Sequence, residues 1–265
     1  MMDGTRHEVS GSDGVPIGLL TAGEGPPLLL VHGGVGQIER WAPMWDLLSD
    51  HRRVTAMDRR GRGSSGDGAE YAVEDEYGDV AAVVQALAED SGGPVDVFAH
   101  SYGATCALGA ARHAPPFGGL VLYEPPGPET ATPEFVDRLT AWVDEGRPGR
   151  AMVAFLMEII GLSEAEVDAL RATPPAYDIL AVLAATLPRE GRALLTADVV
   201  GSARAVTCPT LLLLGERSPA WAGEVTEAVA AVAPGDEVTL LPGLGHEAID
   251  AAPELLVDLL DRFLG

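Results

Sequence analysis

The stretch Val95-Asp96-Val97-Phe98-Ala99-His100-Ser101-Tyr102-Gly103-Ala104 decides the fold. Its first four residues predict a short buried strand, and the apolar residues of 104–112 recur at helical spacing. Ser101 therefore lies at a strand-to-helix turn, with the small residues Ala99 and Gly103 two positions to either side. Such a turn exposes a nucleophilic serine and leaves helix N–H groups free to stabilise negative charge. We predict that Ser101 is a nucleophile; an ordinary turn serine is the alternative.

Alternating strand and helix patterns extend in both directions from this turn. Residues 5–10 and 15–21 flank the turn signal Gly11-Ser12-Asp13-Gly14 and predict a hairpin. Further buried strands are expected at 28–31, 54–57, 120–122, 210–214 and 238–241. Amphipathic helices are expected at 41–48, 80–87, 104–112, 225–232 and 255–263. Strands that alternate with helices predict an α/β fold with a mostly parallel sheet and helices on both faces.

One connection is much longer than the others. Roughly eighty residues between Tyr123 and Cys208 show helical patterns and no clear strand. Helices are expected there at 135–143, 151–160, 167–170 and 179–187. We expect one α/β core domain made of residues 1–127 and 206–265, with residues 128–205 inserted as a helical cap over one edge of the sheet. The apolar residues of this cap predict substrate contacts at Trp142, Phe155 and Met157.

Composition narrows the class of protein. The chain of 265 residues carries 17 basic and 40 acidic side chains, for a formal net charge of −23, and contains no lysine. So acidic a chain repels phosphate backbones, which argues against nucleic-acid binding. No apolar run approaches the ~20 residues of a membrane span, the N-terminal residues lack a signal-peptide pattern, and two cysteines are too few for a disulfide framework. We expect a soluble cytoplasmic protein that acts on a small molecule.

Two further motifs fit a nucleophilic serine. His32-Gly33-Gly34-Val35-Gly36 follows the strand predicted at 28–31, and its glycines leave backbone N–H groups able to face a reacting oxygen. The N–H groups of Gly34 and Tyr102 are candidates for an oxyanion hole; a plain glycine turn is the alternative. His246 follows the last predicted strand, in a position to act as the general base for Ser101. A surface histidine is the alternative for His246.

The signals for a cofactor or a metal are weaker. Gly61-x-Gly63-x-x-Gly66 matches a dinucleotide-binding string, but a polar acidic loop follows it where that motif requires a helix. A chain without lysine has no P-loop, and the six scattered histidines show no zinc-ligand spacing. We therefore expect no cofactor and no metal. Asp58 and the arginines Arg59, Arg60 and Arg62 are expected to brace the end of the sheet.

Together these motifs resemble the α/β-hydrolase family over essentially the whole chain. The resemblance rests on His32-Gly33-Gly34, Asp58-Arg59-Arg60-Gly61-Arg62-Gly63-Ser64-Ser65-Gly66, the Ser101 turn, Cys208-Pro209-Thr210 and Gly245-His246. It implies a catalytic triad in the order nucleophile, acid, histidine. The family's usual acid position holds Ser218 here. Some members instead take the acid from the end of the preceding strand, so Glu124 is the expected acid and Glu216 is the alternative.

The resemblance implies a serine hydrolase that cleaves an ester, thioester or lactone of a medium-sized, largely apolar molecule through an acyl-enzyme. A carbon–carbon hydrolase, lyase or cyclase is the nearest alternative, because a fold does not set the chemistry. A catalytically silent small-molecule receptor and a nucleotide-binding oxidoreductase are more distant alternatives. The sequence leaves the substrate, the stereochemistry and the oligomeric state open.

Overall fold

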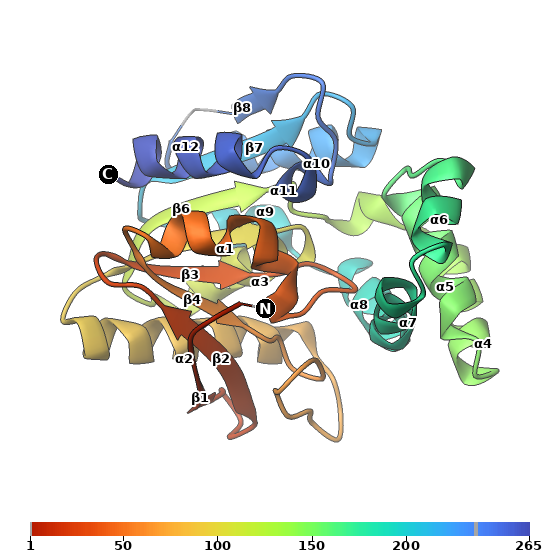
Figure 1. The fold of residues 1–265 in the computed structure, drawn as a ribbon, viewed down its shortest axis with the longest axis horizontal. Coiled ribbons are helices and arrows are strands. Elements are labelled where there is room, and N and C mark those ends of the chain that lie inside the picture. The colour runs from red at the N-terminus through yellow and green to blue at the C-terminus, as the bar shows by residue number, and fades with distance from the viewer. Residues whose placement is uncertain (1, 236–237) are drawn as a thin grey trace.

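One eight-stranded sheet forms the centre of the computed structural model, which describes residues 2–235 and 238–265 (Figure 1). The strands follow the order β1-β2-β4-β3-β5-β6-β7-β8. β3 to β8 are parallel, whereas β2 pairs antiparallel with both of its neighbours. The strands are β1 (Thr5–Ser10), β2 (Pro16–Ala22), β3 (Pro27–Val31), β4 (Arg53–Met57), β5 (Val95–His100), β6 (Phe117–Tyr123), β7 (Thr210–Gly215) and β8 (Val238–Leu241).

Helices cover both faces of the sheet. Along β3, Leu28 and Leu30 pack into one core cluster and Leu29 and Val31 into another, so this strand is buried on both sides. One face carries α2 (Val73–Ser91), α3 (Tyr102–Ala110), α9 (Val199–Ala203) and α10 (Ala220–Ala230). The other face carries α1 (Ala42–Ser49), α11 (Ala248–Ala251) and α12 (Pro253–Leu264).

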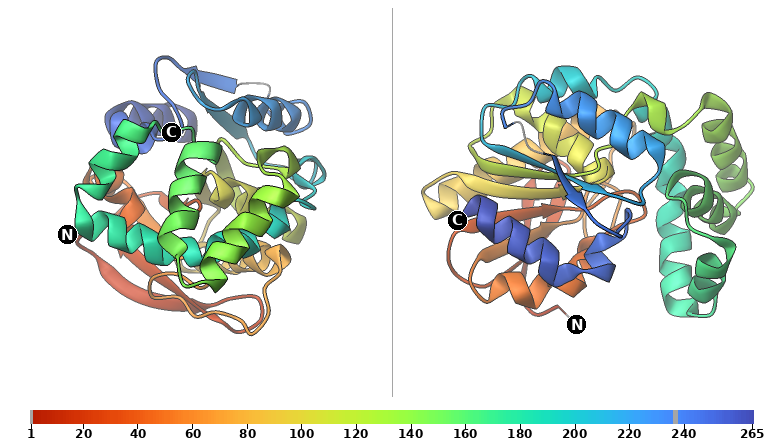
Figure 2. Two further views of the ribbon diagram at one scale, coloured as in Figure 1. Left: turned by 90° about the vertical axis from the view of Figure 1, so that its right-hand side faces the viewer. Right: turned by 90° about the horizontal axis from the view of Figure 1, so that it is seen from above.

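A group of helices between β6 and β7, which we call the insertion, lies beyond the C-terminal ends of the parallel strands (Figures 1 and 2). Its buried side chains form a third core cluster, which also includes Val35 and Trp221. Proline occupies the first turn of four of these helices, where its missing N–H costs no hydrogen bond. The helices are α4 (Pro133–Asp144), α5 (Pro148–Ala154), α6 (Glu164–Arg171), α7 (Pro174–Leu183) and α8 (Leu187–Leu194), with a π-helical turn at Phe155–Ile159.

The structure confirms the predicted fold class, and a strand is present at each predicted position. The helix predicted at 179–187 is instead divided between α7 and α8, and α9 was not predicted. α9 packs on α3 in the core cluster of the sheet, although it falls within the predicted cap of residues 128–205. The division of the chain at 128 and 205 stays a prediction.

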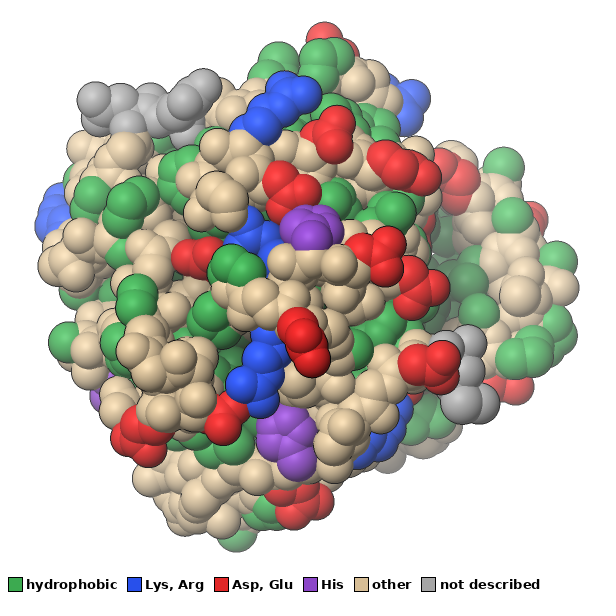
Figure 3. Space-filling view, turned by 60° about the vertical axis from the view of Figure 1, so that its left-hand side comes forward, with side chains coloured by type: hydrophobic (Ala, Val, Ile, Leu, Met, Phe, Trp, Pro, Cys, Tyr) green, Lys and Arg blue, Asp and Glu red, His purple; other side chains and the backbone are tan. Residues whose placement is uncertain are grey.

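Charged side chains lie on the surface of the protein, as the composition leads us to expect. On the face that Figure 3 shows, acidic and basic side chains are interspersed among uncharged ones. No helix in the described part of the chain is both long enough and apolar enough to cross a membrane.

Candidate active site

Ser101 occupies a strained turn between β5 and α3. Its backbone has φ 54° and ψ −128°, a conformation that costs a non-glycine residue on the order of 1–3 kcal/mol and is typical of functional sites. Gly103 permits the turn to be this sharp. A Cβ on Gly103 would lie 2.4 Å from the carbonyl oxygens of Val31 and His32, so only glycine lets α3 approach the end of β3 so closely.

Glu124 and His246 form a buried pair at the end of the neighbouring strand. His246 Nδ1 lies 2.5 Å from Glu124 Oε2, and the side chain of Glu124 is fully buried. The other carboxylate oxygen, Oε1, accepts hydrogen bonds of 2.6 Å from Gly215 N–H and from the Ser218 hydroxyl. Glu124 also has a positive φ of 50°, which turns its side chain out of the β6 register. Ser218 therefore supports the carboxylate and does not replace it.

The His246 ring lies close to the Ser101 turn. It packs against the ring of His100, the residue before Ser101, with 4.5 Å between ring centroids and 40° between the ring planes. Trp221, whose ring centroid lies 5.5 Å from that of His246, lines the same pocket as Ser101. Because Nδ1 of His246 is engaged by Glu124, Nε2 is the ring nitrogen that this contact leaves free.

Polar contacts fix the loop that carries His246. His100 Nε2 lies 3.1 Å from the carbonyl oxygen of His246, which can only accept, so this nitrogen carries the proton. The Tyr123 hydroxyl donates to the carbonyl oxygen of Gly245. Burial and the neighbouring His246 lower the pKa of His100 well below its ordinary value, so the ring of His100 is a neutral support.

The loop after β3 presents backbone N–H groups beside the serine. A Cβ on Gly33 would lie 2.8 Å from the Ser101 Cβ, so glycine is required for this close approach. Within residues 2–235 and 238–265, neither the Gly34 N–H nor the Tyr102 N–H donates a hydrogen bond. Two free donors next to a serine are what an oxyanion hole requires.

The buried ring of His32, at the start of the same loop, makes a hydrogen bond with each of its two nitrogens. His32 Nδ1 donates to the Gly33 carbonyl oxygen over 2.9 Å, and His32 Nε2 accepts from the Arg59 N–H over 3.2 Å. Both contacts require the neutral ring with its proton on Nδ1. Burial and the nearby charge of Arg59 lower the pKa of His32 well below its ordinary value, which matches that protonation state.

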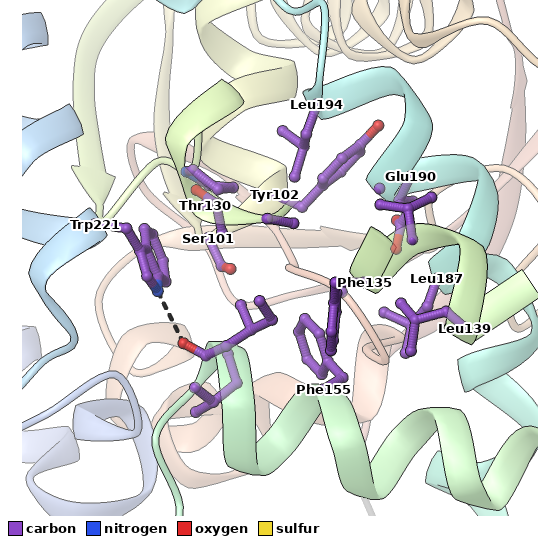
Figure 4. A pocket seen from close by; sticks show the side chains of 17 residues that line it. Ser101, Tyr102, Thr130, Phe135, Leu139, Phe155, Leu187, Glu190, Leu194 and Trp221 are labelled. Carbon is purple, nitrogen blue, oxygen red and sulfur yellow. Dashed lines mark hydrogen bonds between the residues drawn. The ribbon is translucent and has the colours of Figure 1, made fainter. Parts of the chain in front are cut away.

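A small cavity of about 40 Å³ lies between the Ser101 turn and the insertion (Figure 4). The loops and turns at the strand ends contribute Gly34, Ser101 and Tyr102, and the insertion contributes mainly apolar side chains. The further lining residues are Pro126, Thr130, Ala131, Phe135, Val136, Leu139, Phe155, Ile159, Ile160, Leu187, Glu190, Gly191, Leu194 and Trp221.

Of the three predicted substrate contacts, the structure places only Phe155 along this cavity. Met157 is 39% exposed, because two residues along a helix rotate a side chain to nearly the opposite face. Trp142 packs within the third core cluster, with Arg138 beside its ring. The predictions for Met157 and Trp142 therefore differ from the structure.

The alternative acid, Glu216, lies outside the site. Its carboxylate is exposed and accepts a hydrogen bond of 2.7 Å from the Gly243 N–H. Among the described residues, no three His, Cys, Asp or Glu side chains are grouped as metal ligands would be.

A buried charge cluster joins the insertion to the sheet beside the cavity. Arg59 donates to Glu76 and to Glu190 over 2.6 Å each, and Arg62 also donates to Glu190. Burial alone would raise the pKa of Glu76, but Arg59 and Arg62 lower it below its ordinary value. The guanidinium of Arg59 lies over the Tyr102 ring, 4.8 Å from its centroid. The expected bracing role of Arg59 and Arg62 therefore depends on two carboxylates.

Sequence reasoning missed several lining residues, of which Glu190 is the most consequential. The only signal in the sequence was indirect: a cluster of arginines at the end of the sheet needs acidic partners. Nothing in the spacing of the chain indicates that one partner comes from residue 190. Thr130, Phe135 and Trp221 were missed because their positions depend on how the insertion folds back.

This fold and this site define a class of protein. The model of the alpha/beta hydrolase family matches residues 28–259, and the chain belongs to that family of hydrolases. The chain is 29% identical over 253 residues to a 2-(acetamidomethylene)succinate hydrolase of Mesorhizobium japonicum, covering 91% of this chain and 89% of that protein. It is also 29% identical over 255 residues to a pimeloyl-(acyl-carrier protein) methyl ester esterase of Methylococcus capsulatus, covering 89% and 90%.

Solved structures show the same fold. An alpha/beta hydrolase from Sphaerobacter thermophilus is similar with a TM-score of 0.77 and 31% identity, over 96% of this chain and 100% of that one. An enol-lactonase from Burkholderia xenovorans has a TM-score of 0.78 at 19% identity, over 97% and 99% of the two chains. At that identity, the second likeness concerns the fold alone.

Proposed function

We propose that this protein is a serine hydrolase that cleaves an ester, thioester or lactone through an acyl-enzyme. The observation that carries the proposal is the 2.5 Å contact between Glu124 and His246 beside a cavity lined by Ser101. A carboxylate on Nδ1 fixes the histidine tautomer and steadies the imidazolium, as a triad acid does. Relatives named as a succinate-type hydrolase and a methyl ester esterase support hydrolytic chemistry.

The five groups divide the steps of the proposed reaction among them. His246 Nε2 takes the proton of the Ser101 hydroxyl, and the serine oxygen attacks the carbonyl carbon. The N–H groups of Gly34 and Tyr102 bind the oxygen that becomes negative. The imidazolium of His246, balanced by Glu124, then gives its proton to the leaving group. A water molecule, activated by the same histidine, releases the acid and restores Ser101.

The lining of the cavity favours a substrate that is largely apolar. Its lining is dominated by side chains such as Phe135, Phe155 and Leu187, and Glu190 is the charged member among the described residues. A carboxylate placed beside Glu190 would meet a like charge in a buried site. This disfavours a substrate that carries a carboxylate there, unlike the succinate named for the Mesorhizobium relative. We propose that the insertion acts as the cap over this cavity.

A second chemistry on the same triad gains no support from the site. Ser218 at the family's usual acid position was the reason to consider a lyase, a cyclase or a carbon–carbon hydrolase. The argument from Ser218 weakens because the Glu124 carboxylate contacts His246 Nδ1, and the Ser218 hydroxyl donates a hydrogen bond to that carboxylate.

Ser101→Ala tests the proposal directly. We expect the wild type to hydrolyse some members of a series of p-nitrophenyl esters from acetate to decanoate. The variant should lose roughly 10⁶-fold in kcat, because a triad acts as a unit, while its circular dichroism spectrum stays unchanged.

Covalent labelling provides the control. A serine-directed fluorophosphonate should label the wild type and Ser163→Ala, whose serine caps an exposed helix, but not Ser101→Ala. A wild type that is neither active on any ester nor labelled would leave the receptor interpretation in place of the hydrolase.

A further inference from the structure

Glu190 is a buried acid whose two carboxylate oxygens differ in their hydrogen bonding. Oε1 accepts from the guanidinium groups of both Arg59 and Arg62. Oε2 is fully buried and has no hydrogen-bond partner in the described part of the chain, although the Glu190 side chain is only 3% exposed. A buried carboxylate oxygen without a donor costs free energy, so such an oxygen calls for an explanation.

The free oxygen lies beside Gly34, at the edge of the cavity that holds Ser101. Glu190 lines that cavity together with Gly34, and its Oε2 lies 3.6 Å from where a Cβ on Gly34 would be. Figure 4 shows the Glu190 side chain among the apolar residues around the cavity. Of the other polar lining groups, Trp221 Nε1 donates to the Ile159 carbonyl oxygen, and Thr130 Oγ1 accepts from the Gly127 N–H and keeps its own O–H to donate.

We propose that Glu190 Oε2 is a specificity site that accepts a hydrogen bond from a neutral donor, a hydroxyl or an amide N–H, on the acyl part of the substrate. The inference rests on the proposed hydrolase function and names its substrate class.

The charge balance around Glu190 selects a neutral donor. Arg59 and Arg62 carry two positive charges, and Glu76 and Glu190 carry two negative charges, so the buried cluster is already neutral. A cationic substrate group would add an unbalanced charge next to two guanidinium groups, at a high desolvation cost. An anionic group would face Glu190 itself. A hydroxyl or an amide satisfies Oε2 without adding a charge.

The arrangement around Ser101 assigns the donor to the acyl part. Trp221 marks the end of the cavity where His246 lies, with 5.5 Å between their ring centroids. Glu190 and Trp221 lie on opposite sides of Ser101 in Figure 4. The leaving group must be near His246 to receive its proton, so the acyl chain extends toward Glu190.

Binding to Ser101→Ala tests the inference without turnover. The probes are methyl esters from 3-hydroxybutanoate to 6-hydroxyheptanoate, each paired with the ester in which a methyl group replaces the hydroxyl. At the chain length that reaches Glu190, calorimetry should show roughly 10- to 100-fold tighter binding of the hydroxy ester, the range for a hydrogen bond to a charged group. Equal binding within each pair at every length would overturn the inference.

Adding Glu190→Gln to Ser101→Ala should remove the preference. The guanidinium groups hold the amide oxygen, so the amide nitrogen faces the cavity and donates where Glu190 accepted. The matched control is Glu134→Gln, an exposed acid of the same insertion, which should keep the preference. A preference that persists in the Glu190 variant would assign the donor contact to another residue and overturn the proposal.

A ligand comparison covers the case in which Glu190→Gln does not fold. Keto esters, from 3-oxobutanoate to 6-oxoheptanoate, present an oxygen acceptor where the hydroxy esters present a donor. In Ser101→Ala the keto esters should bind several-fold more weakly than the methyl-branched esters, because the keto oxygen and Glu190 Oε2 are both acceptors. Tighter binding of the keto esters would contradict the inference. Wild-type turnover is measured separately. Hydrolysis of both members of every pair at equal rates rejects the Glu190 site alone, whereas no hydrolysis of any ester rejects the hydrolase function.

Discussion

Glu124 connects two parts of the site, because one of its oxygens contacts His246 and the other is held by β7 and the loop after it. Glu124→Gln keeps an oxygen for Gly215 N–H and the Ser218 hydroxyl, but turns an N–H donor toward His246 Nδ1. The histidine would then need its other tautomer, with the proton on Nε2. We expect kcat to fall by up to ~10⁴-fold with little change in the unfolding midpoint, measured by ester turnover and thermal denaturation.

Glu216→Gln is the matched control for this prediction. Glu216 carries the same change at an exposed site, where it contacts only the Gly243 N–H among the described residues. Its turnover should stay close to that of the wild type. Full activity in the Glu124 variant, combined with an inactive Glu216 variant, would transfer the acid role to Glu216.

At the scale of single residues, the sequence predicts which residue types take part better than it predicts where their side chains point. Strand ends indicated two candidate acids, and the resemblance favoured Glu124. What turns that side chain toward His246 is a positive φ of 50°, together with the two donors supplied by β7 and the loop after it. Those contacts join residues about ninety positions apart in the chain, so no local pattern could reveal them.

At the scale of elements, the turn at Phe155–Ile159 separates two residues that the sequence grouped together. The Phe155 ring reaches to within 3.5 Å of a Cβ position on Gly34, whereas Met157 points outward. Phe155→Ala should therefore lengthen the preferred acyl chain, changing the octanoate-to-acetate ratio of kcat/KM by about 10-fold. Met157→Ala should leave that ratio unchanged, and equal shifts in both variants would show that the cavity is formed differently.

The helix α8 shows why a buried charged residue escaped prediction. Its apolar residues Leu187 and Leu194 are seven positions apart, and charged side chains fill much of the interval. Glu190 faces inward nevertheless, because its ion pairs with Arg59 and Arg62 compensate its charge. The helix is strongly amphipathic, so its presence could be predicted from the sequence, but no pattern of apolar residues indicates that the charged Glu190 lies on its buried face.

At the scale of the whole molecule, the sheet was predictable because its strands are buried on both faces. Such strands appear in the sequence as short continuous apolar runs, as at Leu28 to Val31, and breakers separate them. How the insertion folds over the strand ends could not be predicted in this way. Its helices meet the sheet domain through buried ion pairs to Glu190 and through apolar residues such as Val35 and Trp221, which carry no distinguishing pattern in the sequence.

The stability of the whole molecule should depend on two buried neutral histidines. The pKa values of His32 and His100 are lowered in the folded state, so below about pH 6.5 the unfolded chain binds more protons than the folded one. The free energy of unfolding is therefore highest above that pH and falls on acidification, by up to about 1.4 kcal/mol per pH unit for each histidine. Urea titrations between pH 7.5 and 5.5 measure this slope.

His32→Gln isolates one of the two contributions. Protonation of His32 at Nε2 would break its hydrogen bond from the Arg59 N–H, and glutamine has no such titration. The variant should be less stable at pH 7.5, because the fit of the ring to Gly33 and Arg59 is lost. Between pH 6.5 and 5.5, however, its slope should be shallower by up to about 1.4 kcal/mol per pH unit. His7→Gln, at an exposed strand position, should keep the wild-type slope. An unchanged slope in the His32 variant would mean that another group governs the acid sensitivity.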